Sequence, residues 1–185
     1  AVALVIVLCL WLEPARGGRV IALLLAACWA WVGWAFLHLR LAPIHWVADW
    51  YAVAFFIQAL LLFVYGLWPR GPEFAIGKSA RAGIGLLILL GALLAMPATA
   101  HLTGRAWQQA ELFAMTPDAT ALATLGLLLL AKGRSAVWLA VIPVAWCLVS
   151  GATLWVLEAP EAMILPAGAV LTIALMLTPR LRAKR

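Results

Sequence analysis

Residues 20–39 read VIALLLAACWAWVGWAFLHL, a run of apolar and aromatic residues. It contains no Asp, Glu, Lys or Arg. As a helix it matches the roughly 20 apolar residues that cross the hydrocarbon core of a bilayer. Arg16 and Arg19 precede it and Arg40 follows it, so charge returns on both sides. The pattern predicts a transmembrane helix.

The rest of the chain has the same character. Of its 185 residues, 67% are hydrophobic and 11% are charged, and the mean hydropathy is +1.08. A soluble domain would need more polar residues to cover its surface. The apolar runs are continuous, not alternating, which favours helices over a barrel. We therefore expect an all-α, polytopic transmembrane helix bundle that forms a single integral-membrane domain over residues 1–185.

Six further apolar runs bring the predicted number of spans to about seven. They are residues 1–12, 50–68, 82–100, 118–131, 135–157 and 163–178. The first run is short and the chain begins on Ala, so we expect this span to be truncated. The run 118–131 would reach about 21 Å as a helix. We expect it to stay short, to thin the bilayer locally, or to sit against other helices.

The basic residues predict the orientation of these spans. Eleven of the 13 Lys and Arg lie in the first, third and fifth connections and in the C-terminal tail; Arg40 and Arg105 are the exceptions. By the positive-inside rule, the N-terminus is outside and the tail is cytoplasmic. The net charge of +6 then reflects attraction to anionic lipid. It gives no reason to expect nucleic acid as a partner.

The stretch WAWVGWAFLHLRLAPIHWVADWY, residues 29–51, collects aromatic and ionisable side chains. Such tryptophans are typical of the aromatic belt at a membrane surface. Trp31, Trp34 and His38 are spaced i, i+3, i+7 and so share one helical face. Two interpretations stay open for that face. In the first, the tryptophans pack in the core and His38 meets water at the membrane boundary. In the second, the tryptophans line a ligand pocket that ends at His38.

The histidines suggest a metal site. His45 and Asp49 are four residues apart, and His38 and His101 come from neighbouring spans at similar depth. Together these four residues offer the nitrogen and oxygen ligands that zinc, copper or iron bind. No compact HExxH or CxxC motif is present. The sequence therefore offers a candidate metal site but requires no metal or other cofactor.

Gln58 is the strongly polar side chain near the middle of a predicted span, and it joins Trp31, Trp34 and His38 as a candidate ligand-binding residue. An unpaired amide in hydrocarbon costs on the order of 2–7 kcal/mol. We therefore expect Gln58 to meet another helix, water or a ligand. No span carries Lys, Arg, Asp or Glu near its middle, which argues against a proton-driven carrier of charged substrates.

Residues 103–116, TGRAWQQAELFAMT, predict an amphipathic helix on the outer surface. The sequence Thr116-Pro117-Asp118 then predicts the start of the next span. Thr is a common N-cap, Pro favours the first helical position, and Asp complements the helix dipole in the first turn. We expect Asp118 to act through this capping role.

Four segments carry a family resemblance: WAWVGWAF (29–36), LAPIHW (41–46), TPDATALATLGLLLLAKG (116–133) and VIPVAWCLVSGATLW (141–155). They resemble an uncharacterised family of small, multi-span bacterial inner-membrane proteins, some of which are loosely labelled permeases. The resemblance covers nearly the whole chain. It implies a helical bundle in the bacterial inner (cytoplasmic) membrane, and it implies no activity and no catalytic residues.

Three functions stay open at this point. The first is an accessory or assembly subunit that docks on a larger membrane complex or associates with itself. The second is a small transporter or channel for a neutral solute, and the third is a metal-binding membrane protein. The small residues in the spans permit tight helix packing, and with the lack of mid-span charge they favour the first. The sequence favours a role without catalysis, with the lipid bilayer and other membrane subunits as partners.

Overall fold

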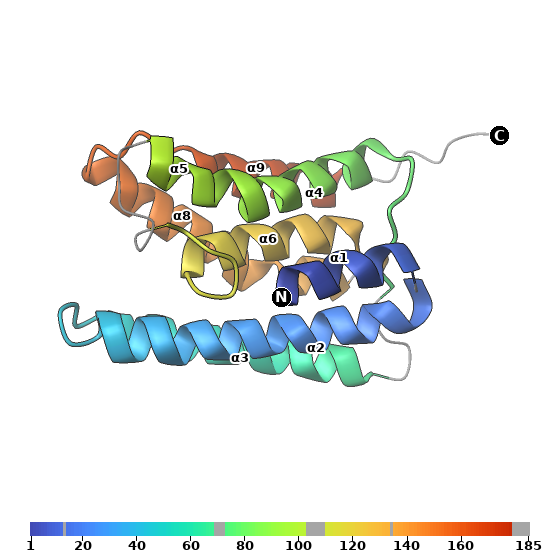
Figure 1. Cartoon of the computed structure of the whole chain (residues 1–185), viewed down its shortest axis with the longest axis horizontal. Coiled ribbons are helices and arrows are strands. Elements are labelled where there is room, and N and C mark those ends of the chain that lie inside the picture. The colour runs from blue at the N-terminus through green and yellow to red at the C-terminus, as the bar shows by residue number, and fades with distance from the viewer. Residues whose placement is uncertain (13, 69–72, 103–109, 134, 179–185) are drawn as a thin grey trace.

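The protein is described by a computed structural model over residues 1–12, 14–68, 73–102, 110–133 and 135–178 (Figure 1). Apart from an isolated β-bridge between Phe74 and Ala131, the regular structure of these residues is helical. The elements are α1 (Val2–Leu12), α2 (Pro14–Val32), η1 (Gly33–Leu41, a π-helix), α3 (Ala48–Leu67), α4 (Ala80–Leu90), η2 (Gly91–Ala95, a π-helix), α5 (Met96–Leu102), α6 (Pro117–Leu130), α7 (Ser135–Leu139), α8 (Val141–Val156) and α9 (Ile164–Leu177). The all-helical fold predicted from the sequence is confirmed.

Within the described ranges, four helices are long and apolar enough to cross a membrane. They are Gly17–Leu41, Ala48–Leu67, Ala80–Thr99 and Ser135–Val156. Three shorter apolar helices cover Val2–Trp11, Pro117–Leu130 and Ile164–Leu177. Each of these segments coincides with one of the predicted runs, although three of them are shorter than a standard span.

Successive helices run in alternate directions, so their connections gather at the two ends of the bundle (Figure 1). The end that carries Arg19, Lys78 and Lys132 is called the basic end here. The opposite end carries the η1–α3 and α8–α9 connections. The other basic residues that the sequence places on this side include Arg70, Arg134 and those of the C-terminal tail, which lie outside the described residues, so the predicted orientation stays a prediction.

The short helix α6 lies at the centre of the bundle. It packs against α2, α4, α8 and α9, and Figure 1 shows it between the α2–α3 pair and the α4–α9 layer. All 14 of its residues are buried. Of the alternatives open for residues 118–131, the structure has the one in which the short helix sits against other helices.

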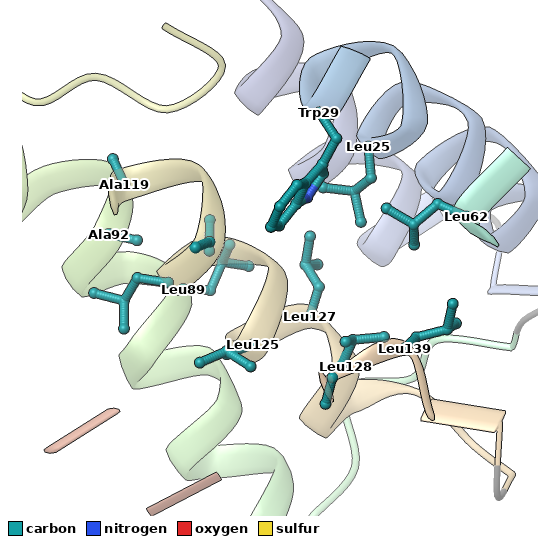
Figure 2. Packing of buried hydrophobic residues seen from close by; sticks show 14 of the residues in the cluster. Leu25, Trp29, Leu62, Leu89, Ala92, Ala119, Leu125, Leu127, Leu128 and Leu139 are labelled. Atoms are coloured by element: carbon teal, nitrogen blue, oxygen red, sulfur yellow. The ribbon is translucent and has the colours of Figure 1, made fainter. Parts of the chain in front are cut away.

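Glycine allows α4 and α6 to approach backbone to backbone. A Cβ on Gly126 would lie 2.7 Å from the backbone nitrogen of Leu89 and 2.8 Å from the carbonyl oxygen of Gly85. No side chain fits at such distances, so this contact depends on glycine, as close helix packing in membranes commonly does. Figure 2 shows the apolar side chains that surround it, with Leu89 from α4 against Leu125 and its neighbours from α6.

Candidate functional site

The carboxylate of Asp118 lies inside the bundle. Its Oδ1 accepts a 2.7 Å hydrogen bond from the indole Nε1 of Trp146, and its Oδ2 accepts a 2.8 Å bond from the hydroxyl of Ser150. The residue is 6% exposed. Trp146 and Ser150 are four residues apart on α8, so one helical face presents both donors. Each carboxylate oxygen thus has a partner, as a buried carboxylate requires.

Asp118 is recessed from the opposite end of the bundle. Its partner Trp146 precedes Val156, the last residue of α8, by ten residues, which is about 15 Å along a helix. Figure 1 shows α6 beginning inside the end formed by η1, α5 and α8. The sequence placed Asp118 at the outer edge of a span. Because α6 is shorter than its neighbours, its first turn lies instead beside the middle of α8.

The start of α6 differs in part from the prediction. Thr116 is the N-cap and Pro117 is in the first turn, as expected. However, the N-cap makes no side-chain cap hydrogen bond, and the Thr116 hydroxyl donates to the Leu112 carbonyl instead. Since both oxygens of Asp118 accept from α8, this carboxylate joins two helices. Asp118 lies in the first turn of α6, as its capping role requires, and the contact with α8 is a second role that the sequence did not indicate.

Thr120 completes the turn before α6. Its hydroxyl oxygen accepts a 3.0 Å hydrogen bond from the backbone nitrogen of Ala114 and donates a 2.7 Å bond to the Thr116 carbonyl. Ala114 has a φ of 63°, which non-glycine residues rarely adopt. Of the surface helix predicted over residues 103–116, residues 103–109 lie outside the described part of the chain, and residues 110–116 are not helical but contain a turn at residues 113–115.

An aromatic cluster continues from Asp118 into the core. The Trp146 ring meets Tyr51 and Phe55 edge-on, with centroid distances of 5.4 and 5.1 Å. Phe55 also packs on Trp29 at 4.3 Å. The buried Trp29 points toward α6 (Figure 2), where its Nε1 donates a 2.9 Å hydrogen bond to the Thr124 hydroxyl. These contacts connect α2, α3 and α8 to the central helix.

Gln58 makes a hydrogen bond to the Leu139 carbonyl, which Pro143 cannot reach with an N–H donor. Its Nε2 donates a 3.0 Å hydrogen bond to the Leu139 carbonyl, and the side chain is fully buried. Pro143 lies four residues after Leu139 and has no N–H to donate to it, and α7 ends at Leu139. The other amide atom, Oε1, has no hydrogen-bond partner among the described residues. Of the partners expected for Gln58, the structure supplies another helix.

The exposed end of η1 carries the other cluster predicted from the sequence. His38 Nδ1 lies 2.7 Å from Asp49 Oδ1, and the two side chains are 44% and 60% exposed. The Trp34 ring lies 5.0 Å from the His38 ring, centroid to centroid. His45 stacks on Tyr51 at 6.4 Å. The structure therefore joins His38 to Asp49 through a side-chain contact and places His45 against an aromatic ring.

The two tryptophans of the predicted pocket face outward. Trp31 is 57% exposed and Trp34 is 51% exposed. The Trp34 ring contacts His38, as the spacing predicted, but both tryptophans lie on the outer surface of the bundle. Gln58 is buried on α3, so the four predicted ligand-binding residues do not surround one common space. Their binding role stays a prediction.

The metal site also stays a prediction. Among the residues whose side chains are described, no three His, Cys, Asp or Glu stand close enough to hold an ion. His101 belongs to α5, and its side chain lies outside the described part of the chain. The His38–Asp49 pair supplies two of the four predicted ligands, and the residues described around it add no third.

Comparison with known proteins identifies the family. A family described as a family of unknown function (DUF6064) matches residues 1–185. The chain belongs to this family. The match agrees with the resemblance drawn from residues 29–46 and 116–155, and it extends over the whole sequence. No curated protein and no solved structure matches the chain, so the geometry of the DUF6064 chain has to carry the functional argument.

Sequence reasoning missed the recessed carboxylate of this DUF6064 chain. A conventional helix start explained Asp118, so its side chain was assigned to that helix alone. The missed signal was the length of the run 118–131. A helix too short to span a bilayer and packed on all sides must begin or end within the bundle. An acidic residue in its first turn then lies within the bundle as well.

Proposed function

We propose that the protein is a multi-span protein of the bacterial inner membrane, with its N-terminus outside and its C-terminal tail in the cytoplasm. The orientation rests on the basic end, where Arg19 lies near the start of α2 and Lys78 and Lys132 lie in the α3–α4 and α6–α7 connections. The opposite end carries Arg40 and the His38–Asp49 pair. Cytoplasmic loops are enriched in Lys and Arg, so the basic end faces the cytoplasm in this proposal.

Cysteine labelling tests the orientation. Cys9, Cys28 and Cys147 are first replaced by Ala, and single cysteines are then introduced as Lys78→Cys at the basic end and Ile44→Cys in the η1–α3 connection at the opposite end. Both native side chains are exposed. An impermeant maleimide added to whole spheroplasts should label Ile44→Cys and should reach Lys78→Cys only after lysis. Labelling of Lys78→Cys in intact spheroplasts would reverse the orientation.

Within the membrane, we propose that the protein is an accessory or assembly subunit of a larger complex. This proposal rests on the observation that the buried polar groups make hydrogen bonds between helices. Asp118 bonds to Trp146 and Ser150, Trp29 bonds to Thr124, and Gln58 bonds to a backbone carbonyl. These groups hold helices together. Meanwhile, large aromatic side chains such as Trp31 and Trp34 face outward, where another membrane protein could cover them.

A pathway for a neutral solute is the second candidate. One observation favours it: Gln58 Oε1 is buried and has no hydrogen-bond partner among the described residues. A free acceptor at that depth would suit a passing hydroxyl or amide. The other amide atom of Gln58 is already engaged, which is why the subunit role ranks first.

Two measurements separate these functions. Purification from native membranes in mild detergent, followed by mass spectrometry, should recover the subunit in fixed stoichiometry with another membrane protein. Proteoliposomes of the purified chain should show the same solute flux with and without Gln58→Leu. A chain recovered alone, together with a flux that Gln58→Leu abolishes, would favour the solute pathway over the subunit role.

A further inference from the structure

A cavity of about 540 Å³ opens at the basic end of the bundle. One wall is the last part of α3 and its C-cap, with Leu61, Val64, Tyr65 and Trp68, and the other includes Lys132 and Ser135. Its volume is within the range of roughly 300–1,000 Å³ that is usual for small-molecule sites. None of the contacts described for Asp118, Gln58 or the His38–Asp49 pair involves it, so it is a separate feature of the fold.

The wall on α3 is apolar and faces outward. Leu61, Val64, Tyr65 and Trp68 are spaced i, i+3, i+4, i+7, so they form one stripe along the helix. Leu61, Val64 and Trp68 are exposed on the bundle surface. In a bilayer such a stripe meets acyl chains, and the aromatic residues at its end lie where Trp and Tyr are enriched, at the interface with water.

The other wall is polar and firmly placed. The backbone nitrogen of Lys132 donates a 2.8 Å hydrogen bond to the Glu73 carbonyl, and the Ala75 nitrogen donates to the Leu130 carbonyl at 3.2 Å. These bonds pin the two connections together beside buried Phe74. Gly133 follows with a φ of +100°, a conformation suited to glycine. The backbone of Lys132 is thus held in place beside the cavity.

Hydrogen-bonding groups gather where the two walls meet. The Tyr65 and Ser135 side chains, each with a hydroxyl group, both line this junction. Lys132 Nζ lies 3.2 Å from Glu73 Oε2, and both side chains are about 60% exposed. One ion pair uses one of the three N–H donors of a lysine. Lys132 therefore keeps donors for an anion that enters the cavity.

We propose that this cavity binds a phospholipid with an anionic headgroup. The inference rests on the proposed membrane location of the protein. An acyl chain would lie on the stripe of Leu61 and Val64, and the phosphate would meet Lys132 and the Ser135 hydroxyl. A free phosphate would make no use of the apolar wall. The excess of Lys and Arg at this end of the bundle favours an anionic headgroup over a zwitterionic one.

The test uses the full chain in nanodiscs of equal parts phosphatidylglycerol and phosphatidylcholine. Native mass spectrometry then counts the lipids that stay bound after the bulk lipid is stripped. The wild type should retain phosphatidylglycerol in preference to phosphatidylcholine. Lys132→Gln should lower this preference about fivefold, the effect of one basic side chain at a membrane surface. Lys78→Gln is the matched control, because Lys78 is at the same end but outside the cavity, and it should lower the preference much less than Lys132→Gln does.

A second variant separates lipid binding from a structural role of the ion pair. Glu73→Gln breaks the pair but leaves Lys132 and its backbone contacts in place, so retention should equal or exceed that of the wild type. Soluble glycerol phosphate, added at a concentration equal to that of the phosphatidylglycerol, should not displace the lipid, because it lacks acyl chains.

The assignment is overturned if the wild type holds both lipids equally, or if Glu73→Gln and Lys132→Gln reduce retention alike. Displacement by glycerol phosphate would also overturn it, in favour of a phosphate site without a lipid. Failure of the wild type to enter nanodiscs at all would instead contradict the proposed membrane location. If the protein enters the bilayer but retains phosphatidylglycerol and phosphatidylcholine equally, the lipid site is contradicted and the membrane location is not.

Discussion

Two aspartates of this protein make hydrogen bonds of the same length in different surroundings. Asp118 lies 2.7 Å from Trp146 inside the bundle, and Asp49 lies 2.7 Å from His38 on its surface. Asp118 is 6% exposed, whereas the Asp49 side chain is 60% exposed. Water can replace the partner of Asp49 but not those of Asp118. Burial, more than hydrogen-bond length, therefore determines how much each contact stabilises the fold.

The largest effect is expected from Asp118→Ala. This substitution leaves the buried Trp146 Nε1 and the Ser150 hydroxyl without their acceptor, and each orphaned group costs about 1–3 kcal/mol. We expect a loss of about 3 kcal/mol in the free energy of unfolding, measured by titration with a denaturing detergent in mixed micelles.

Asp118→Asn is the matched control for that change. Its carbonyl can accept from Trp146 while its amide donates to the Ser150 oxygen, so most of the stability should return. If Asp118→Asn and Asp118→Ala were equally destabilising, the hydrogen bonds to α8 would not be the cause.

The next effect should come from the glycine contact beside the same helix. Gly126→Ala forces a Cβ to within 3 Å of backbone atoms of α4. Overpacking of this kind costs about 2 kcal/mol. Gly83→Ala is the matched change on α4, since its Cβ would have no heavy atom within 4 Å. The same titration should show that Gly83→Ala is neutral or stabilises by up to about 1 kcal/mol. Equal losses from the two substitutions would contradict the close packing of α4 on α6.

A smaller effect is expected from Trp29→Phe. The substitution keeps most of the aromatic packing on Phe55 but removes the donor to Thr124. Hydrogen bonds between membrane helices contribute about 1 kcal/mol, so the free energy of unfolding should fall by about that amount. In a Thr124→Val background the donor has already lost its acceptor, and Trp29→Phe should then cost much less.

The smallest effect is expected at the exposed pair. His38→Ala and Asp49→Ala should each change the free energy of unfolding by less than about 1 kcal/mol, because surface ion pairs contribute little. Raising the salt concentration should weaken any residual effect. A loss as large as that of Asp118→Ala would show that the His38–Asp49 contact supports the fold in a way that its exposure does not suggest.

Much of the fold follows from the sequence because apolar run length is a strong signal. The run 20–39 lies within the helix Gly17–Leu41, and the run 50–68 matches α3, Ala48–Leu67, to within two residues at each end. Prolines also stand close to helix boundaries. Pro117 stands at the start of α6, and Pro143 follows the break between α7 and α8.

The arrangement of the site could not be read in the same way. Helical spacing predicted the proximity of Trp34 and His38, whose rings are in contact, but spacing does not say which face turns inward. For Gln58, the sequence required a partner without identifying Leu139, which is 81 residues away. Asp118 had a sufficient local explanation, and its actual partners lie on α8. Contacts between distant segments depend on packing that a single sequence does not display.

The most direct test of this account is a double-mutant cycle between Asp118 and Trp146. Unfolding free energies are measured for Asp118→Ala, Trp146→Phe and the double variant, beside the same cycle for Asp49→Ala and His38→Ala. The inner cycle should give a coupling of about 1.5 kcal/mol, and the outer cycle less than about 0.5 kcal/mol. Additivity of the inner pair within about 0.3 kcal/mol would contradict the claim that the recessed carboxylate holds α6 to α8.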